Sequence, residues 1–163
     1  MDKDYVNYKE GYPHIEDALK KGAKLHAFLS GGGLRVVTIK KGDEELSYAE
    51  HPYFPGALAY CDDDFGQDYE QLYLGENRKH EHYLTGAYPY PFDAFDVHLK
   101  QGRTFDVFYS ERWKQFICTI PAPMILHRNN EILWGSSSGL LSAIVTCLLS
   151  FQFEDKEEFE KKI

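Results

Sequence analysis

The chain has 163 residues, of which 43% are hydrophobic and 15% aromatic, and its formal net charge is −8. These values predict a single folded domain with a packed interior and exclude an intrinsically disordered chain. The negative charge argues against a nucleic-acid-binding protein, which needs a basic surface to displace counterions from phosphates. The longest apolar run, Leu140–Leu149, is too short to span a bilayer, so we expect no membrane anchor. Because this run has apolar residues on nearly all sides, we expect it to form the most buried helix of the protein.

The first predicted elements are a helix and a β-hairpin. Pro13 favours a helix start, and the apolar residues of His14–Lys21 recur with helical spacing. Lys24–Ser30 alternates between apolar and polar residues, which indicates a strand with one buried face. Gly31–Gly33 supplies a turn that can use positive φ, and the β-branched residues of Leu34–Ile39 favour a second strand.

A short third strand over Glu45–Ala49 leads through two prolines into a helix over Gly56–Cys61. The first unit of structure therefore covers about residues 13–75. Residues 76–91 show no regular hydrophobic period and contain many turn-forming residues, so we expect an irregular connector. We expect a charged C-terminal tail over residues 151–163. Its possible docking points are Phe151, Phe153 and Phe159.

The second part of the chain repeats the first. Residues 15–30 match residues 95–110 at an offset of 80, and residues 45–61 match residues 131–147 at an offset of 86. The identical pairs are Leu19/Leu99, Lys20/Lys100, Gly22/Gly102, Phe28/Phe108, Ser30/Ser110, Glu45/Glu131, Ala57/Ala143 and Cys61/Cys147. We predict an α+β fold of two pseudo-symmetric αβββα halves, residues 13–75 and 92–150, with helices packed on a mostly antiparallel sheet. A chance likeness of two generic α+β patterns is the alternative.

The order helix, three strands, helix resembles that of double-stranded RNA-binding domains. The last predicted helix of each half lies in Pro55–Cys61 and Ser138–Leu149, and these segments contain no Lys or Arg. The resemblance is therefore one of topology and implies no RNA binding here.

The three cysteines lie in helix or strand patterns, and an odd number leaves one unpaired in any disulfide scheme. We expect all of them to be reduced core residues and the protein to be cytoplasmic. His80 and His82 share one face of an extended chain and are weak candidates for metal ligands, but no third ligand can be placed. We therefore expect no metal and no cofactor.

No pattern in the chain indicates catalysis. The serines of Ser136–Ser138 are expected to cap the helix that follows, and no serine lies in a Gly-x-Ser-x-Gly elbow. The carboxylates occur in runs and not as an isolated pair in an apolar setting. A non-enzymatic function is therefore favoured.

The remaining signal is an excess of aromatic residues, with 12 Tyr, 11 Phe and 2 Trp. Aromatic residues bordered by charge are typical of binding surfaces, although such residues can also be covered by the rest of the chain. The candidate binding residues are Tyr83, Tyr88 and Tyr90 in the connector, and Tyr48, Glu50, His51, Trp134, Ser136 and Ser137 at the ends of the third strands.

We predict a non-catalytic binding protein, of the inhibitor, immunity-protein or adaptor type, that contacts a basic surface of another protein. The alternative is a small-molecule-binding or hydrolytic protein with a pocket between the halves, where the third-strand ends would lie close together. A homodimer is a third possibility.

Overall fold

The computed structural model describes residues 11–63, 65, 92–121, 131–149 and 152–163. The elements, in chain order, are α1 (Pro13–Lys20), β1 (Lys24–Leu29), β2 (Arg35–Lys41), β3 (Glu44–His51), α2 (Phe54–Asp63), α4 (Phe92–Lys100), β4 (Phe105–Ser110), β5 (Gln115–Pro121), β6 (Glu131–Ser137), α5 (Leu140–Leu149), β7 (Gln152–Asp155) and α6 (Lys156–Lys162).

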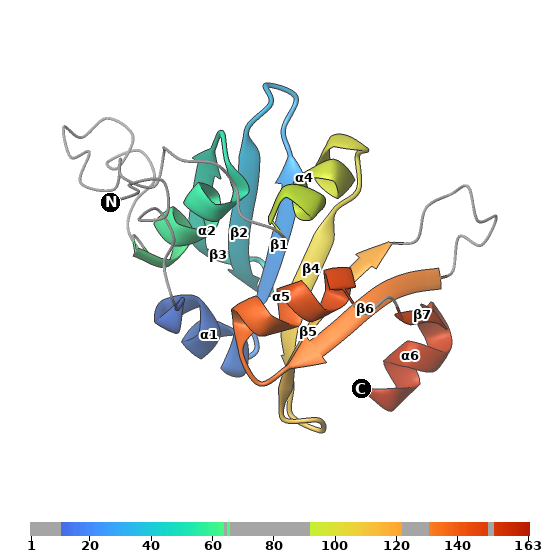
Figure 1. Cartoon of the computed structure of the whole chain (residues 1–163). Coiled ribbons are helices and arrows are strands. Elements are labelled where there is room, and N and C mark those ends of the chain that lie inside the picture. The colour runs from blue at the N-terminus through green and yellow to red at the C-terminus, as the bar shows by residue number, and fades with distance from the viewer. Residues whose placement is uncertain (1–10, 64, 66–91, 122–130, 150–151) are drawn as a thin grey trace, which may run out of the picture.

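The strands form one seven-stranded sheet in the order β3-β2-β1-β4-β5-β6-β7, and each neighbouring pair is antiparallel. Helices α1, α2, α4 and α5 lie over one face of this sheet (Figure 1). We call this side the helix face and the opposite side the outer face. The predicted α+β class and antiparallel pairing are confirmed. Among the described residues, no helix is long and apolar enough to cross a membrane.

The first strand of each predicted half lies at the centre of the sheet. β1 and β4 pair with Leu25 opposite Val107, His26 opposite Asp106 and Ala27 opposite Phe105. Strands β2 and β3 extend the sheet on one side of this pair, and β5 and β6 extend it on the other. The order helix, three strands, helix therefore occurs twice within one continuous sheet.

The hydrophobic core lies between the helices and the helix face. Alternate residues of the central strands point into it, and Leu25, Ala27, Phe105 and Val107 are all 0% exposed. The ring of Phe54 from α2 packs edge-on against the ring of Phe105, with centroids 5.2 Å apart. The core is therefore continuous from one half of the sheet to the other.

Helix α5 lies directly against strand β6 at Gly135. A Cβ atom on Gly135 would lie 2.3 Å from the backbone nitrogen of Cys147 and 2.5 Å from its Cα. The backbones of strand and helix are therefore in contact, and only glycine leaves room for this approach.

The bounds predicted for α5 are confirmed, but two expectations about it are wrong. It is not the most buried helix, because Leu149 is 49% exposed while α2 buries most of its residues. Ser136 and Ser137 do not cap it, because both pair with β5 as part of strand β6. The first amide of the helix, that of Leu140, instead donates to Oε2 of Glu16 at 2.8 Å.

The segment expected to be a charged tail extends the sheet. Strand β7 pairs with β6, and α6 follows it with Asp155 as its N-cap, whose side chain accepts hydrogen bonds from two backbone amides. At the other end of α6, Trp113 Nε1 donates to the carbonyl of Lys162 at 3.1 Å. Phe159, a predicted docking point, is 1% exposed. Phe151 lies outside the described residues.

Helix α4 is attached to the sheet by an ion pair. The guanidinium of Arg35 on β2 donates to both carboxylate oxygens of Asp96, with Nε–Oδ1 and Nη2–Oδ2 distances of 2.7 Å. The two side chains are only 13% and 10% exposed, and Lys100 Nζ lies 3.3 Å from the same carboxylate. Burial raises the pKa of Asp96, but the hydrogen bonds and charges of Arg35 and Lys100 outweigh it and hold this pKa below its usual value.

Replacing Asp62 by alanine is expected to destabilise the fold by about 1–2 kcal/mol, because Asp62 caps α1. Its buried Oδ1 accepts from the amides of His14 and Ile15 at 2.9 and 3.0 Å. Denaturant unfolding of Asp62→Ala and Asp62→Asn would measure the loss. The asparagine variant keeps an acceptor oxygen and should lose less; equal losses would show that the cap is not the cause.

Candidate functional site

Six side chains form a row across the outer face, one from each of six adjacent strands. The strand register places them side by side, and we call them the central row. Its members, in order, are Tyr48, Thr38, His26, Asp106, Thr119 and Trp134. The row contains two of the predicted binding residues, Tyr48 and Trp134, at its two ends.

The middle of the central row is a histidine–aspartate pair. His26 Nδ1 lies 2.7 Å from Asp106 Oδ1, and the side chains are 42% and 43% exposed. The hydrogen bond to Asp106 raises the pKa of His26 above its ordinary value, against the opposing effects of burial and of Lys40. The pair therefore places a hydrogen-bonded imidazole and a carboxylate side by side at the junction of β1 and β4.

Two phenylalanines, Phe28 and Phe108, flank this pair on the outer face by strand alternation. The ring of Phe28 lies 5.5 Å from that of His26, measured between centroids. Lys24 Nζ lies 5.8 Å from the centroid of the Phe108 ring, within the range of a cation–π contact. Both phenylalanines are half-buried, so the outer face combines aromatic and charged groups.

Strand β3, which supplies Tyr48 to the central row, also carries three glutamates. Glu44 and Glu45 are exposed, and Glu50 is half-buried. The hydroxyl of Tyr48 donates to Oε1 of Glu50, which fixes this tyrosine and this carboxylate together. Because β3 stands at the end of the strand order, these residues lie along an edge of the sheet.

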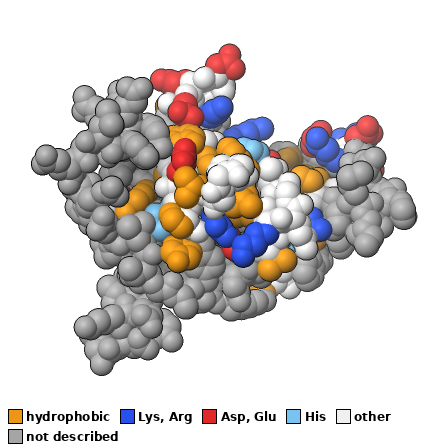
Figure 2. All heavy atoms as spheres, turned by 90° about the horizontal axis from the view of Figure 1, so that it is seen from above, with side chains coloured by type: hydrophobic (Ala, Val, Ile, Leu, Met, Phe, Trp, Pro, Cys, Tyr) orange, Lys and Arg blue, Asp and Glu red, His pale blue; other side chains and the backbone are white. Residues whose placement is uncertain are grey.

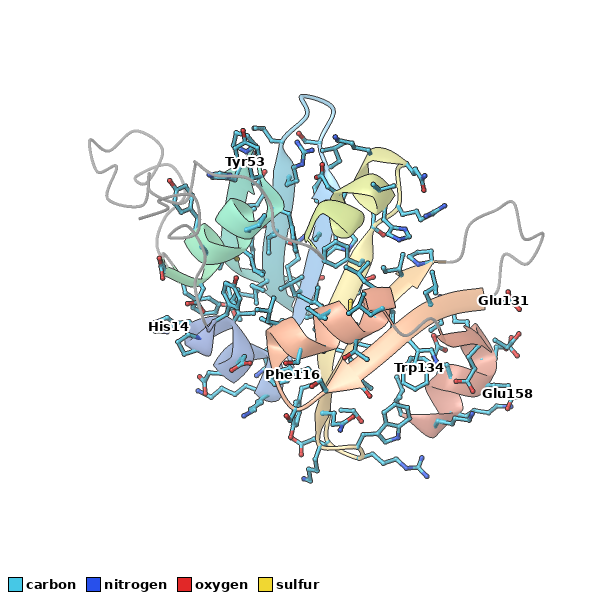
Figure 3. The ribbon with its side chains drawn as sticks, in the orientation of Figure 1. His14, Tyr53, Phe116, Glu131, Trp134 and Glu158 are labelled. Carbon is cyan, nitrogen blue, oxygen red and sulfur yellow. The ribbon has the colours of Figure 1, made fainter. Side chains whose placement is uncertain are left out.

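Trp134, at the other end of the row, is covered by α6. Its ring lies 5.1 Å from that of Phe159 and 5.4 Å from that of Trp113. Figure 3 shows Trp134 directed toward this helix, away from α1, α2 and α5. Its contacts within the chain account for its aromatic surface, so Trp134 is a poor candidate for contact with a partner.

His51 points to the helix face and is 1% exposed. Its Nδ1 accepts from the amide of Tyr53 at 2.9 Å, and its Nε2 has no hydrogen-bond partner among the described residues. A Cβ on Gly56 would lie 2.3 Å from two atoms of the His51 ring, so the ring rests directly on that glycine. Burial lowers the pKa of His51 to about 4, against a smaller opposing effect of the Tyr53 carbonyl.

This buried imidazole should make the free energy of unfolding decrease as the pH is lowered. The unfolded chain takes up a proton near pH 6.5, whereas folded His51 does so only near pH 4, so acid favours the unfolded state within that window. We expect a loss of up to about 3 kcal/mol between these limits. Denaturant unfolding at each pH would measure it. The variant His51→Phe should lose this part of the slope; an unchanged slope would contradict the assignment.

The other predicted site residues are not brought together. Ser136 lies on the outer face and Ser137 on the helix face of β6, by strand alternation. The expectation that the ends of the third strands lie close together is wrong, because four strands separate β3 from β6. The structure does not describe Tyr83, Tyr88, Tyr90, His80 or His82. The residues that it does describe contain no group of three or more His, Cys, Asp or Glu side chains able to hold a metal.

Sequence reasoning did not single out His26 and Asp106. The offset of 80 aligns these two residues with each other, and equivalent residues of two antiparallel strands meet where a two-fold axis passes between them. Such a meeting of residues 26 and 106 is what the predicted repeat implies, so the offset in the sequence was a signal for the pair.

The chain was compared with protein-family models, curated proteins and solved structures. None of them matches it.

Proposed function

We propose that this chain is a non-catalytic binding protein that accepts a basic, extended segment of another protein along the edge strand β3 and the adjoining outer face. The observation that carries this proposal is the acidic character of that edge, where Glu44, Glu45 and Glu50 lie on one strand. An extended segment that adds to a sheet gains affinity from main-chain hydrogen bonds and specificity from side chains.

The six neighbouring strands from β3 to β6 are bordered differently at their two edges. Strand β7 covers the outer edge of β6, whereas in the part of the chain that the structure describes no strand pairs with the outer edge of β3. Edge strands are usually protected or used, because their free backbone groups pair readily with another strand. This contrast supports β3 as the edge that a partner uses.

Charge favours a basic partner over a second copy of this chain. Lys40 and Lys41 of β2 lie opposite Glu45 and Glu44, so glutamates are the charges nearest the outer edge. Two copies paired through β3 would bring these glutamates together, which is unfavourable. We therefore expect a monomer, and light scattering that gave the mass of a dimer would contradict this.

Aromatic and apolar side chains add to the proposed surface. Tyr53, which follows β3, is 41% exposed, and Phe28 and Phe108 are half-buried on the outer face. Such a mixture of aromatic and charged groups is typical of a protein-binding surface. Figure 2 looks at the molecule from above, at the end of the sheet where the β1–β2 turn lies, and there too hydrophobic side chains lie beside acidic and basic ones.

We also propose that the two halves are pseudo-symmetric and arose by duplication. The β1–β4 register supports this, because a two-fold axis between His26 and Asp106 would carry Leu25 onto Phe105, at the offset of 80 found in the sequence. Each third strand is also bonded to its following helix at equivalent positions. Ser47 Oγ donates to the Cys61 carbonyl at 2.7 Å, and Cys147 Sγ donates to the Leu133 carbonyl at 3.9 Å.

The alternative of a ligand pocket between the halves has less support. The helix-face residues at the junction of β1 and β4 are fully buried, and the Phe54 and Phe105 rings fill the space above them. A filled junction favours a binding surface over an internal pocket.

The proposal can be tested with a fluorescent peptide of alternating lysine and valine. Its affinity would be measured by anisotropy at low and moderate salt. We expect it to bind at least about tenfold more tightly than a control peptide of alternating glutamate and valine, because the glutamates of that peptide would be repelled by the acidic edge. N-methylation of the alternate peptide amides that face β3 should abolish binding, because these amides would donate to the edge strand.

A matched pair of variants locates the site. Glu44→Lys with Glu45→Lys should weaken binding of the basic peptide at least about tenfold. Glu111→Lys with Glu160→Lys makes the same charge change at exposed positions away from β3 and should have little effect. Equal losses of affinity in the two double variants would show that only the net charge of the protein matters, and would overturn the proposed site. Absence of peptide binding, together with no stoichiometric partner captured from a native lysate at either salt concentration, would overturn the function.

A further inference from the structure

Two of the three cysteines lie next to each other in the core. Cys118 on β5 is directly opposite Gly135 on β6, and the backbone of Cys147 rests on that same glycine. Cys118 is 0% and Cys147 is 1% exposed, and the Cys147 thiol is close enough to influence the pKa of the Cys118 thiol. No disulfide is present between them.

The backbone geometry allows a bond between these sulfurs. A Cβ built on Gly135 lies 2.5 Å from Cys147 Cα, so the helix backbone stands directly above this glycine. Cys118 lies beside the same glycine, about 5 Å away across the strand pair. Because these two displacements are roughly perpendicular, the two Cα atoms are about 6 Å apart, within the range that disulfides span.

We propose that Cys118 and Cys147 form a disulfide in the presence of a low-molecular-weight disulfide such as oxidised glutathione, and that Cys61 remains the free thiol. One cysteine thiolate attacks oxidised glutathione and releases a glutathione thiolate. The other cysteine thiolate then attacks the mixed disulfide and releases the second glutathione. Two protein thiols are oxidised and one molecule of oxidised glutathione is reduced to two of glutathione, so electrons and atoms balance.

The burial of the pair determines when this exchange takes place. Burial raises the pKa of the Cys118 thiol well above its ordinary value, and the hydrogen bond to Cys147 adds to this effect. A protonated, covered thiol reacts slowly. The disulfide therefore forms during folding, or when the last turn of α5, which contains Cys147, opens.

Cys61 provides an internal control for the pair. It occupies the position on α2 that corresponds to Cys147 on α5 and is likewise 0% exposed. In the same correspondence between the two halves, Ala49 takes the place of Gly135 and Val37 takes the place of Cys118. Ala49 and Val37 lie opposite each other, as Gly135 and Cys118 do. Since the chain has three cysteines, no second thiol is left for Cys61.

The test is refolding of the reduced full chain in a glutathione redox buffer, followed by alkylation and peptide mass mapping. We expect a mass loss of about 2 Da, from the removal of two hydrogens, with alkylation confined to Cys61. The melting temperature should rise by roughly 7–14 °C relative to the reduced protein and return on treatment with dithiothreitol.

Single variants separate the possible pairings. Cys61→Ser should keep the disulfide and the melting shift, and Cys118→Ser should lose both. A disulfide that included Cys61, or natively refolded protein with three alkylated cysteines at equilibrium, would overturn the proposal. Mapping of the unmodified chain decides the matter even where a serine variant fails to fold.

Discussion

Replacement of Gly135 by alanine is expected to lower the free energy of unfolding by about 3 kcal/mol or more, or to prevent folding. The added Cβ would meet backbone atoms of Cys147 at 2.3 and 2.5 Å. A flexible side chain could rotate away from such a contact, but the backbone of a helix cannot move unless α5 as a whole leaves the sheet. Denaturant unfolding followed by circular dichroism would measure the loss.

Gly31→Ala is the matched control for this prediction. It makes the same chemical change, but no atom lies within 4 Å of a Cβ built at Gly31, and its φ is not positive. We expect a change within about 0.5 kcal/mol, or a slight stabilisation through the unfolded chain. Similar losses at the two positions would show that the close approach of α5 and β6 is not what makes Gly135 necessary.

Removal of the charge of Asp96 is the second large effect that we expect. In Asp96→Asn, the guanidinium of Arg35, which is 13% exposed, would lose the carboxylate that it contacts through two hydrogen bonds. Removing one charged partner of such a buried ion pair costs about 3 kcal/mol. Thermal and denaturant unfolding would both report this loss.

Two further variants distinguish this ion pair from ordinary surface charges. Lys100 contacts the same carboxylate but is 64% exposed, so Lys100→Ala should cost less than about 0.5 kcal/mol. The double variant Arg35→Met with Asp96→Leu should be more stable than Asp96→Asn, because it leaves no buried charge. A double variant that was less stable would contradict this account.

The Asp96 carboxylate also adds a dependence on pH. Its pKa is lower in the folded protein than its ordinary value. Its contribution to stability is therefore present above the ordinary pKa of an aspartate and is lost as the pH falls through the folded value. This pH-dependent contribution should vanish in Asp96→Asn. It changes at lower pH than most of the contribution of His51.

The elements of the two halves were predictable because their signals are local. Alternation in Lys24–Ser30 and continuous apolar character in Leu140–Leu149 follow from which side of each element faces the core. The pairing of β1 with β4 was less accessible, because it joins residues about 80 positions apart and no local pattern specifies such a partner. The tail was misassigned for a similar reason, since β7 and α6 are stabilised by contacts with β6 and Trp113.

The candidate site was only partly predictable. Tyr48 and Trp134 were selected as equivalent residues, and both lie in the central row. Their different surroundings could not be inferred, because the cover over Trp134 depends on how α6 docks. His51 looked like a surface residue in a polar segment, yet its ring fits over Gly56. A glycine that makes room for a side chain five residues away leaves no sign in the hydrophobic pattern.

The short contact between β1 and β4 has a consequence for the folding kinetics. The β1–β2 ladder has six residue pairs closed by a tight turn, whereas the β1–β4 ladder has three pairs between distant parts of the chain. Local hairpins form in microseconds, but long-range ladders wait for a large loop to close. The two three-stranded units should therefore assemble early, and their joining should be the slow step that limits the rate at which the native sheet appears.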